Sequence, residues 1–143
     1  MAGFLRPEDL RQISSDQEAK EMEKERQLRQ KKKEQTEGLK EAFMSRELHP
    51  EVIERVNHAI SIAARNGETR IQVMTFPAAY CNDGGRRINN LAPDWPDSLE
   101  GFAKKAYEFY QRELRPLGFK LHAEVINYPG GMPGDVGLFL RWE

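Results

Sequence analysis

An unbroken run of charged, helix-forming residues near the N-terminus most constrains how this chain folds. From Arg11 to Glu37 there is no glycine or proline, and good helix formers dominate. Pro7, Glu8 and Asp9 suit a first helical turn, because proline is tolerated there and acids favour the positive end of the helix dipole. The run therefore predicts one long helix, on the order of 50 Å if fully formed at 1.5 Å per residue.

Apolar side chains are sparse along this predicted helix. They are Leu10, Ile13, Met22, Leu28, Leu39, Phe43 and Leu48. The gaps between them do not sustain a heptad, so a tight coiled coil is not expected. A helix with so little apolar surface cannot bury much alone. We therefore expect residues 1–48 to form a charged helical arm that is either mobile or docked on a protein partner or a second copy.

The basic run Arg26–Lys33 within the arm invites a nucleic-acid interpretation. Acids flank it on both sides, at Glu21, Glu23, Glu25, Glu34 and Glu37. Phosphate binding normally needs a net basic face, and the whole chain carries a formal net charge of −1. A solvated helix face is therefore favoured, and nucleic-acid binding is the weaker alternative.

Neither a membrane nor a metal is indicated. No apolar run approaches the roughly 20 residues that span a bilayer. The first residues lack a basic segment followed by an apolar core, as a secretory signal would have. Cys81 is the single cysteine, and no Cys/His cluster has zinc spacing. We expect a cytoplasmic protein without a metal or cofactor.

Residues 49–143 have the pattern of a compact α+β domain. Helical spacing of apolar residues from Val52 to Ala63 predicts one helix, and the same spacing from Leu99 to Leu114 predicts another. Strands are predicted at 69–76, 119–128 and 136–142. In the first strand, alternation puts Ile71, Val73 and Thr75 on one side and Gln72, Met74 and Phe76 on the other.

The expected fold is therefore a small three-stranded mixed sheet with two helices packed on one face, preceded by the long charged helix. The second face of the sheet is predicted to be partly apolar. Such a face is often covered, so a homodimer is favoured modestly.

Two polar, glycine-rich loops, residues 79–90 and 128–135, each follow a predicted strand. A helix long enough to be a crossover lies between those strands, so parallel strands would bring both loops to one end of the sheet, where ligands usually bind. Glycines in the first loop can aim successive N–H groups at an anion, and arginines can add charge. The candidate ligand-binding residues are Asp83, Gly84, Gly85, Arg86, Arg87, Asn89, Tyr128 and Asp135.

The loops also have a purely structural interpretation. The first is then a tight turn whose arginines are solvated or paired with Asp83 or Asp94, and the second is a rigid hairpin loop. Nothing in either loop matches a known phosphate-binding or catalytic motif.

Catalytic chemistry has little support in the sequence. Cys81 follows a strand end, but no spacing ties it to an activating arginine or histidine, so a passive thiol is favoured. His122 and Glu124 share a strand face and are expected to form a structural ion cluster with Arg141. No catalytic residue is assigned, and the sequence leaves enzymatic activity open.

The leading functional hypothesis is a non-enzymatic interaction or regulatory protein. Its arm would serve self-association, with a dimer favoured, or the binding of a protein partner. The alternative is a small-anion-binding or enzymatic site formed by loops 79–90 and 128–135.

Overall fold

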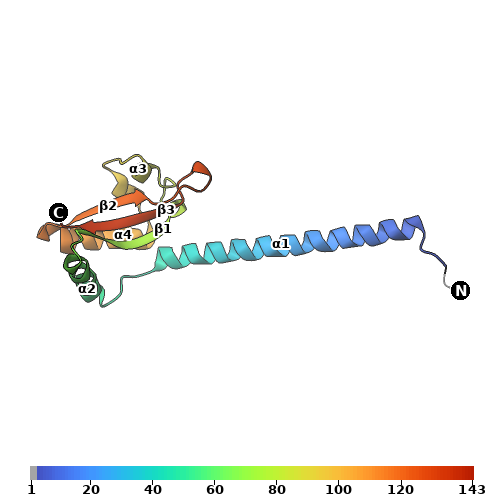
Figure 1. The fold of residues 1–143 in the computed structure, drawn as a ribbon, viewed down its shortest axis with the longest axis horizontal. Helices are drawn as coiled ribbons and strands as arrows, with labels where there is room; N and C mark the ends of the chain where they lie inside the picture. The colour runs from blue at the N-terminus through green and yellow to red at the C-terminus, as the bar shows by residue number, and fades with distance from the viewer. Residues whose placement is uncertain (1–2) are drawn as a thin grey trace. The chain divides into compact units, whose positions relative to one another are not determined.

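The computed structural model describes residues 3–143, which form two compact units. Helix α1 (Pro7–Ser45) is continuous over 39 residues, as Figure 1 shows. None of its residues is buried. The first unit ends at Glu41 and the second spans Ala42–Glu143. The prediction of a long charged N-terminal helix is confirmed.

The second unit contains the remaining helices and all three strands of the described chain. Its helices are α2 (Val52–Arg65), α3 (Arg86–Asn89) and α4 (Gly101–Phe109), and its strands are β1 (Arg70–Pro77), β2 (Lys120–Val125) and β3 (Asp135–Arg141). Short 3-10 turns occur at Ala78–Tyr80, Trp95–Ser98, Arg115–Leu117 and Pro129–Gly131, and a π-helical turn spans Tyr110–Leu114. The α+β fold with a small sheet is confirmed.

The sheet has the order β1-β3-β2, with β3 in the centre (Figure 1). Both pairings are antiparallel, so the predicted mixed sheet is corrected to an antiparallel one. The reason is that β3 inserts between the two earlier strands instead of adding to an edge. Strands β1 and β2 still run in the same direction without being neighbours, so the segments that follow them leave the same end of the sheet.

A β-bulge in β1 corrects the predicted alternation. The pairing of β1 with β3 skips one residue between Gln72 and Met74. A bulge inserts an extra residue, and the residues beyond it change faces. Met74 and Phe76 therefore lie opposite Leu138 and Val136, within the core, and not on the outer face where simple alternation placed them.

The core lies between the sheet and the helices. Leu99, just before α4, and Ala103, within it, pack in one cluster with Ala123, Val136 and Leu138, and each of these residues is at most 3% exposed. Helix α2 faces the same side of the sheet, since its valines join α4 and the strands in lining a small apolar cavity of about 110 Å³. The two-helix layer predicted from the sequence is therefore present.

Adjacent aromatic residues at the end of α4 are accommodated by the π-helical turn. Phe109 and Tyr110 are both buried, at 7% and 9% exposure. The wider turn lets consecutive side chains face the core, and Tyr110 Oη donates to the carbonyl of Phe119 over 2.8 Å. Glu113, a polar residue at an apolar position of the 3.6-residue pattern, is exposed as a result.

The end of α1 belongs to the core of the second unit. The Phe43 ring lies 5.5 Å from that of Phe76, 4.9 Å from that of Tyr80 and 6.1 Å from that of Phe102, between ring centroids. Phe43 therefore belongs to the compact unit that begins at Ala42.

Candidate functional site

The two glycine-rich loops meet at one end of the sheet. Tyr128 Oη donates a hydrogen bond to Asn89 Oδ1 over 2.8 Å, and the backbone N–H of Ala78 donates to the carbonyl of Gly134 over 2.7 Å. This follows from the parallel directions of β1 and β2, which deliver both segments to the same edge. The two loops therefore lie together, as the sequence predicts. What they can bind depends on the side chains there.

Asp83 organises the first loop. Its carboxylate accepts one hydrogen bond from the N–H of Gly85 (2.9 Å) and another from the N–H of Arg87 (3.0 Å). Gly84 and Gly85 have φ values of +70° and +87°, in the left-handed region. The loop does aim N–H groups at one anion, as the sequence suggested, but that anion is the protein's own carboxylate.

The two arginines of the loop differ. Arg87 Nε lies 3.3 Å from Asp94 Oδ2, in an ion pair that is part-exposed on both sides. Arg86 is exposed, and within residues 3–143 it forms no ion pair. Arg86 is therefore the cation that this loop can still offer to a ligand.

The second loop is closed by its own side chains. Asn127 Nδ2 donates to Asp135 Oδ2 over 2.9 Å, and Asn127 Oδ1 accepts from the N–H of Asp135 over 2.8 Å. The backbone N–H of Gly134 donates to the carbonyl of Asn127 over 3.0 Å. Asp135 and Tyr128, both candidate ligand-binding residues, are thus engaged in holding the hairpin and the contact between loops.

Exposed apolar side chains that the sequence analysis does not single out lie directly after the first loop and within the second. Leu91 is 72% exposed and has a φ of +55°, a conformation that non-glycine residues rarely adopt. Met132, in the second loop, is 69% exposed. The Asn-Asn pair before Leu91 is typical of a turn, and it is the feature of the sequence that could have indicated the unusual backbone there.

Cys81 is a buried thiol. Burial raises its pKa to about 11. A hydrogen bond with Ser98 acts in the opposite direction, and the negative charges of Asp83 and Glu100 raise the pKa further. A thiolate nucleophile needs the opposite shift, towards or below neutral pH. The geometry therefore favours the passive thiol over the nucleophile.

The outer sheet face holds a small charged cluster that includes a residue not foreseen. His122 Nε2 lies 3.4 Å from Glu124 Oε2, as the shared strand face suggested. The arginine that joins Glu124 is Arg70, at 3.7 Å, and its guanidinium also lies 4.5 Å from the centroid of the Phe139 ring. Arg141 was expected there, and the difference arises because the strand order was not known from the sequence.

Among residues 3–143, no three or more His, Cys, Asp or Glu side chains are grouped so as to hold a metal ion. Over the same range, no helix has the length and apolar character needed to cross a bilayer. Comparison of the chain with protein families, curated proteins and solved structures yields no match.

Proposed function

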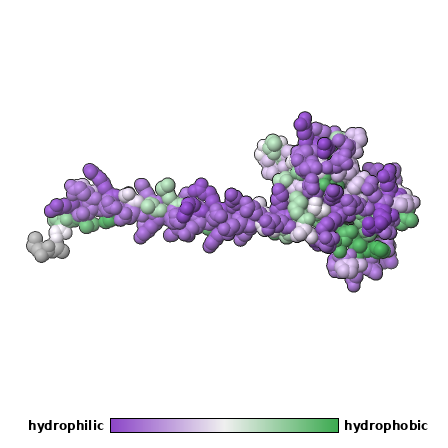
Figure 2. All heavy atoms as spheres, turned by 180° about the vertical axis from the view of Figure 1, so that it is seen from behind, coloured by the Kyte–Doolittle hydropathy of each residue, from purple (hydrophilic) through white to green (hydrophobic). Residues whose placement is uncertain are grey.

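We propose that this chain is a non-enzymatic interaction protein that associates, with itself or with a protein partner, through helix α1. The observation that carries the proposal is the exposure of the apolar residues of α1. Leu10, Ile13, Met22, Leu28 and Leu39 are between 52% and 69% exposed. Figure 2 shows a mainly hydrophilic helix with small apolar patches along it.

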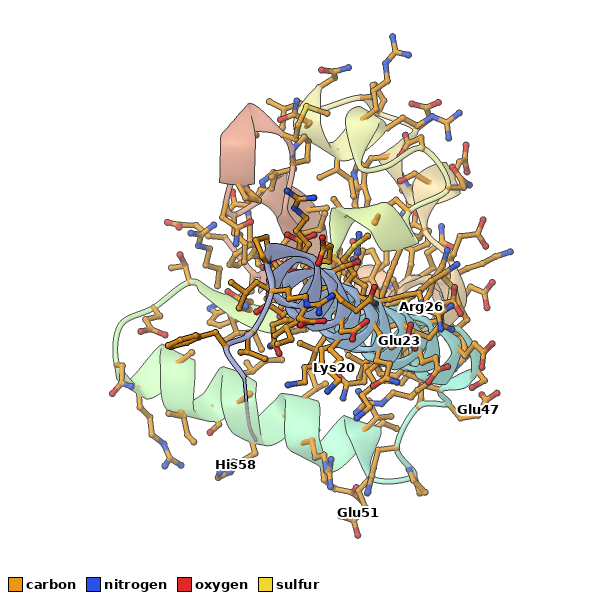
Figure 3. The ribbon with its side chains drawn as sticks, turned by 90° about the vertical axis from the view of Figure 1, so that its right-hand side faces the viewer. Lys20, Glu23, Arg26, Glu47, Glu51 and His58 are labelled. Carbon is orange, nitrogen blue, oxygen red and sulfur yellow. The ribbon has the colours of Figure 1, made fainter. Side chains whose placement is uncertain are left out.

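The local interactions of α1 add little that would hold it as an isolated helix. One ion pair joins Arg26 to Glu23 over 2.8 Å, one turn apart, and Figure 3 shows the two side chains together on the helix. Hydrogen bonding from Arg26 lowers the pKa of Glu23, but both side chains are solvated. Exposed pairs of this kind contribute little, and most helical stability in proteins comes from packing. A packing partner for α1 is the economical explanation.

The alternative of a small anionic ligand at the loops has less support. The N–H groups that would bind an anion are taken by Asp83, and Arg87 is paired with Asp94. The remaining cation of the loop is Arg86, whose side chain is exposed to solvent. This alternative stays a prediction, and the loops are explained by their structural ties.

The proposal keeps the cytoplasmic location expected from the sequence. Its support is the lone Cys81, a buried thiol that pairs with no second cysteine.

Deleting residues 1–41 tests the proposal. The deletion leaves Phe43 and the rest of the second unit in place. We expect the shortened chain to keep its thermal unfolding transition but to lose self-association in sedimentation and partner retention in pull-down. If full and shortened chains sediment as the same species and retain the same proteins, the proposal is wrong.

A further inference from the structure

One face of α1 carries four of its exposed apolar side chains. Leu10 and Leu28 are 18 residues apart, which is five turns at 3.6 residues per turn, and Leu39 follows after 11 residues, close to three turns. Ile13 lies next to Leu10 on the same face. Met22 lies about a third of a turn away. Because the spacing follows the straight-helix period and not 3.5, a partner helix can lie along this face with little supercoil.

The charges of α1 are segregated along its length. Glu8–Glu25 contains seven acidic and three basic residues, a net charge of −4. Arg26–Lys33 contains five basic residues and no acid, a net charge of +5. A helix with one acidic and one basic segment is complementary to a copy of itself that runs in the opposite direction.

We propose that α1 pairs with α1 of a second copy of this chain in an antiparallel two-helix contact, with Leu10 of each copy opposite Leu39 of the other. The inference rests on the proposed function and specifies its partner, orientation and register. The two-fold axis then passes between Lys24 and Glu25. A two-fold contact of this kind is closed and gives a dimer.

The register aligns oppositely charged segments. Residues 16–23 of one copy, with a net charge of −3, run alongside Arg26–Lys33 of the other, with a net charge of +5. The ion pair of Glu23 with Arg26, over 2.8 Å, stays within each helix.

A parallel pair would have the opposite electrostatics. It would place the five basic residues of Arg26–Lys33 against their own copies, and the acids of Glu8–Glu25 likewise. Segments of like charge that face each other repel and so disfavour the parallel orientation. This holds even though each solvated ion pair adds little affinity to the antiparallel one. The apolar face favours contact, and the charges select the antiparallel direction.

Disulfide trapping reads the orientation directly in the full chain. A chain with Leu10→Cys is mixed with a size-tagged chain carrying Leu39→Cys and oxidised. The mixture should yield predominantly the linkage between the two different chains. Buried Cys81 stays out of the reaction, and the unsubstituted chain is the control. Linkage mainly between identical chains would mean a parallel pair and would overturn the inference, while leaving the proposed function standing.

Charge reversal provides a second measurement that does not depend on oxidation. Asp16→Lys with Glu18→Lys changes the net charge of residues 16–23 from −3 to +1, and Lys31→Glu with Lys33→Glu changes that of Arg26–Lys33 from +5 to +1. Each double change should weaken an antiparallel dimer roughly tenfold in sedimentation equilibrium. In a parallel pair each would instead relieve repulsion between like segments.

The outcomes separate the inference from the proposed function. If the charge reversals leave dimerisation unchanged or strengthen it, the antiparallel direction is wrong. If the chain is monomeric at every concentration, self-pairing is wrong, and the deletion of residues 1–41 then decides separately whether α1 binds another protein.

Discussion

Replacing Asp83 by alanine tests whether the first loop is a structural turn or a vacant anion site. The Asp83 carboxylate is the acceptor for the N–H groups of Gly85 and Arg87, at 2.9 and 3.0 Å. Asp83→Ala leaves both donors without that acceptor in a part-buried loop. Asp83→Asn is the matched control, because it retains one side-chain oxygen.

The expected loss of stability follows from the two bonds. A hydrogen bond to a charged group contributes about 1.5–3 kcal/mol, and partial exposure places each of these near the lower limit. Asp83→Ala should therefore lower the free energy of unfolding by about 3 kcal/mol. For a unit of about 100 residues this corresponds to a fall in Tm of roughly 12 °C or more. Asp83→Asn should lose about half as much.

The assay is thermal unfolding of the three proteins with and without phosphate or acetate, at matched ionic strength. The alanine variant should regain part of its Tm when the anion is added, since an external anion can accept from the vacated N–H groups. The unsubstituted protein should show no anion-specific shift, because its own carboxylate occupies the site.

Two results would refute this reasoning. One is an Asp83→Ala protein as stable as the unsubstituted one, which would mean that the carboxylate does not hold the loop. The other is an anion-specific rise in the Tm of the unsubstituted protein that Arg86→Ala abolishes, which would favour the ligand-binding alternative.

Three further predictions concern the same loops. Gly85→Ala should destabilise the protein by about 2–4 kcal/mol in urea unfolding, because its Cβ would lie 2.9 Å from Ala78 Cβ at a φ of +87°; Gly84→Ala, with open space around it, should cost only about 1 kcal/mol. Tyr128→Phe should cost about 1 kcal/mol in the same measurement, and no loss would mean that the loops are held together without the hydroxyl. Burial raises the pKa of Cys81 to about 11, so the thiol of the unfolded chain ionises at lower pH than that of the folded chain. The free energy of unfolding should therefore fall by up to about 2.7 kcal/mol as pH rises from 9 to 11. Cys81→Ala should lack this pH dependence, and an equal pH dependence in the two proteins would contradict the raised pKa.

Much of the fold could be predicted because it depends on local patterns. The long helix follows from an unbroken run of helix formers, and α2, α4 and the strands follow from their periodicities. Strand order was not predictable, since nothing local says that β3 enters between β1 and β2. The bulge at Val73 was missed for a related reason: alternation assumes a regular strand, and only pairing with β3 shows the skipped residue.

For the candidate site, the sequence predicted where the two loops meet, but it did not predict which groups their side chains contact. Strand direction brought the two loops together, and the glycines of the first loop do adopt the left-handed conformation. The sequence could not show that Asp83 binds the N–H groups beside it, because an acid in such a loop can equally face solvent. Arg70 in place of Arg141 beside Glu124 was hidden by the unknown strand order.

Sedimentation velocity of the full chain tests the role of α1 most directly. Three proteins are compared: the unsubstituted chain, a chain with Leu28→Glu and Leu39→Glu, and a chain with Met22→Glu, which changes an equally exposed residue off the apolar face. We predict a dimer for the first and third and a monomer for the second. The same sedimenting species for all three would contradict association through this face of α1.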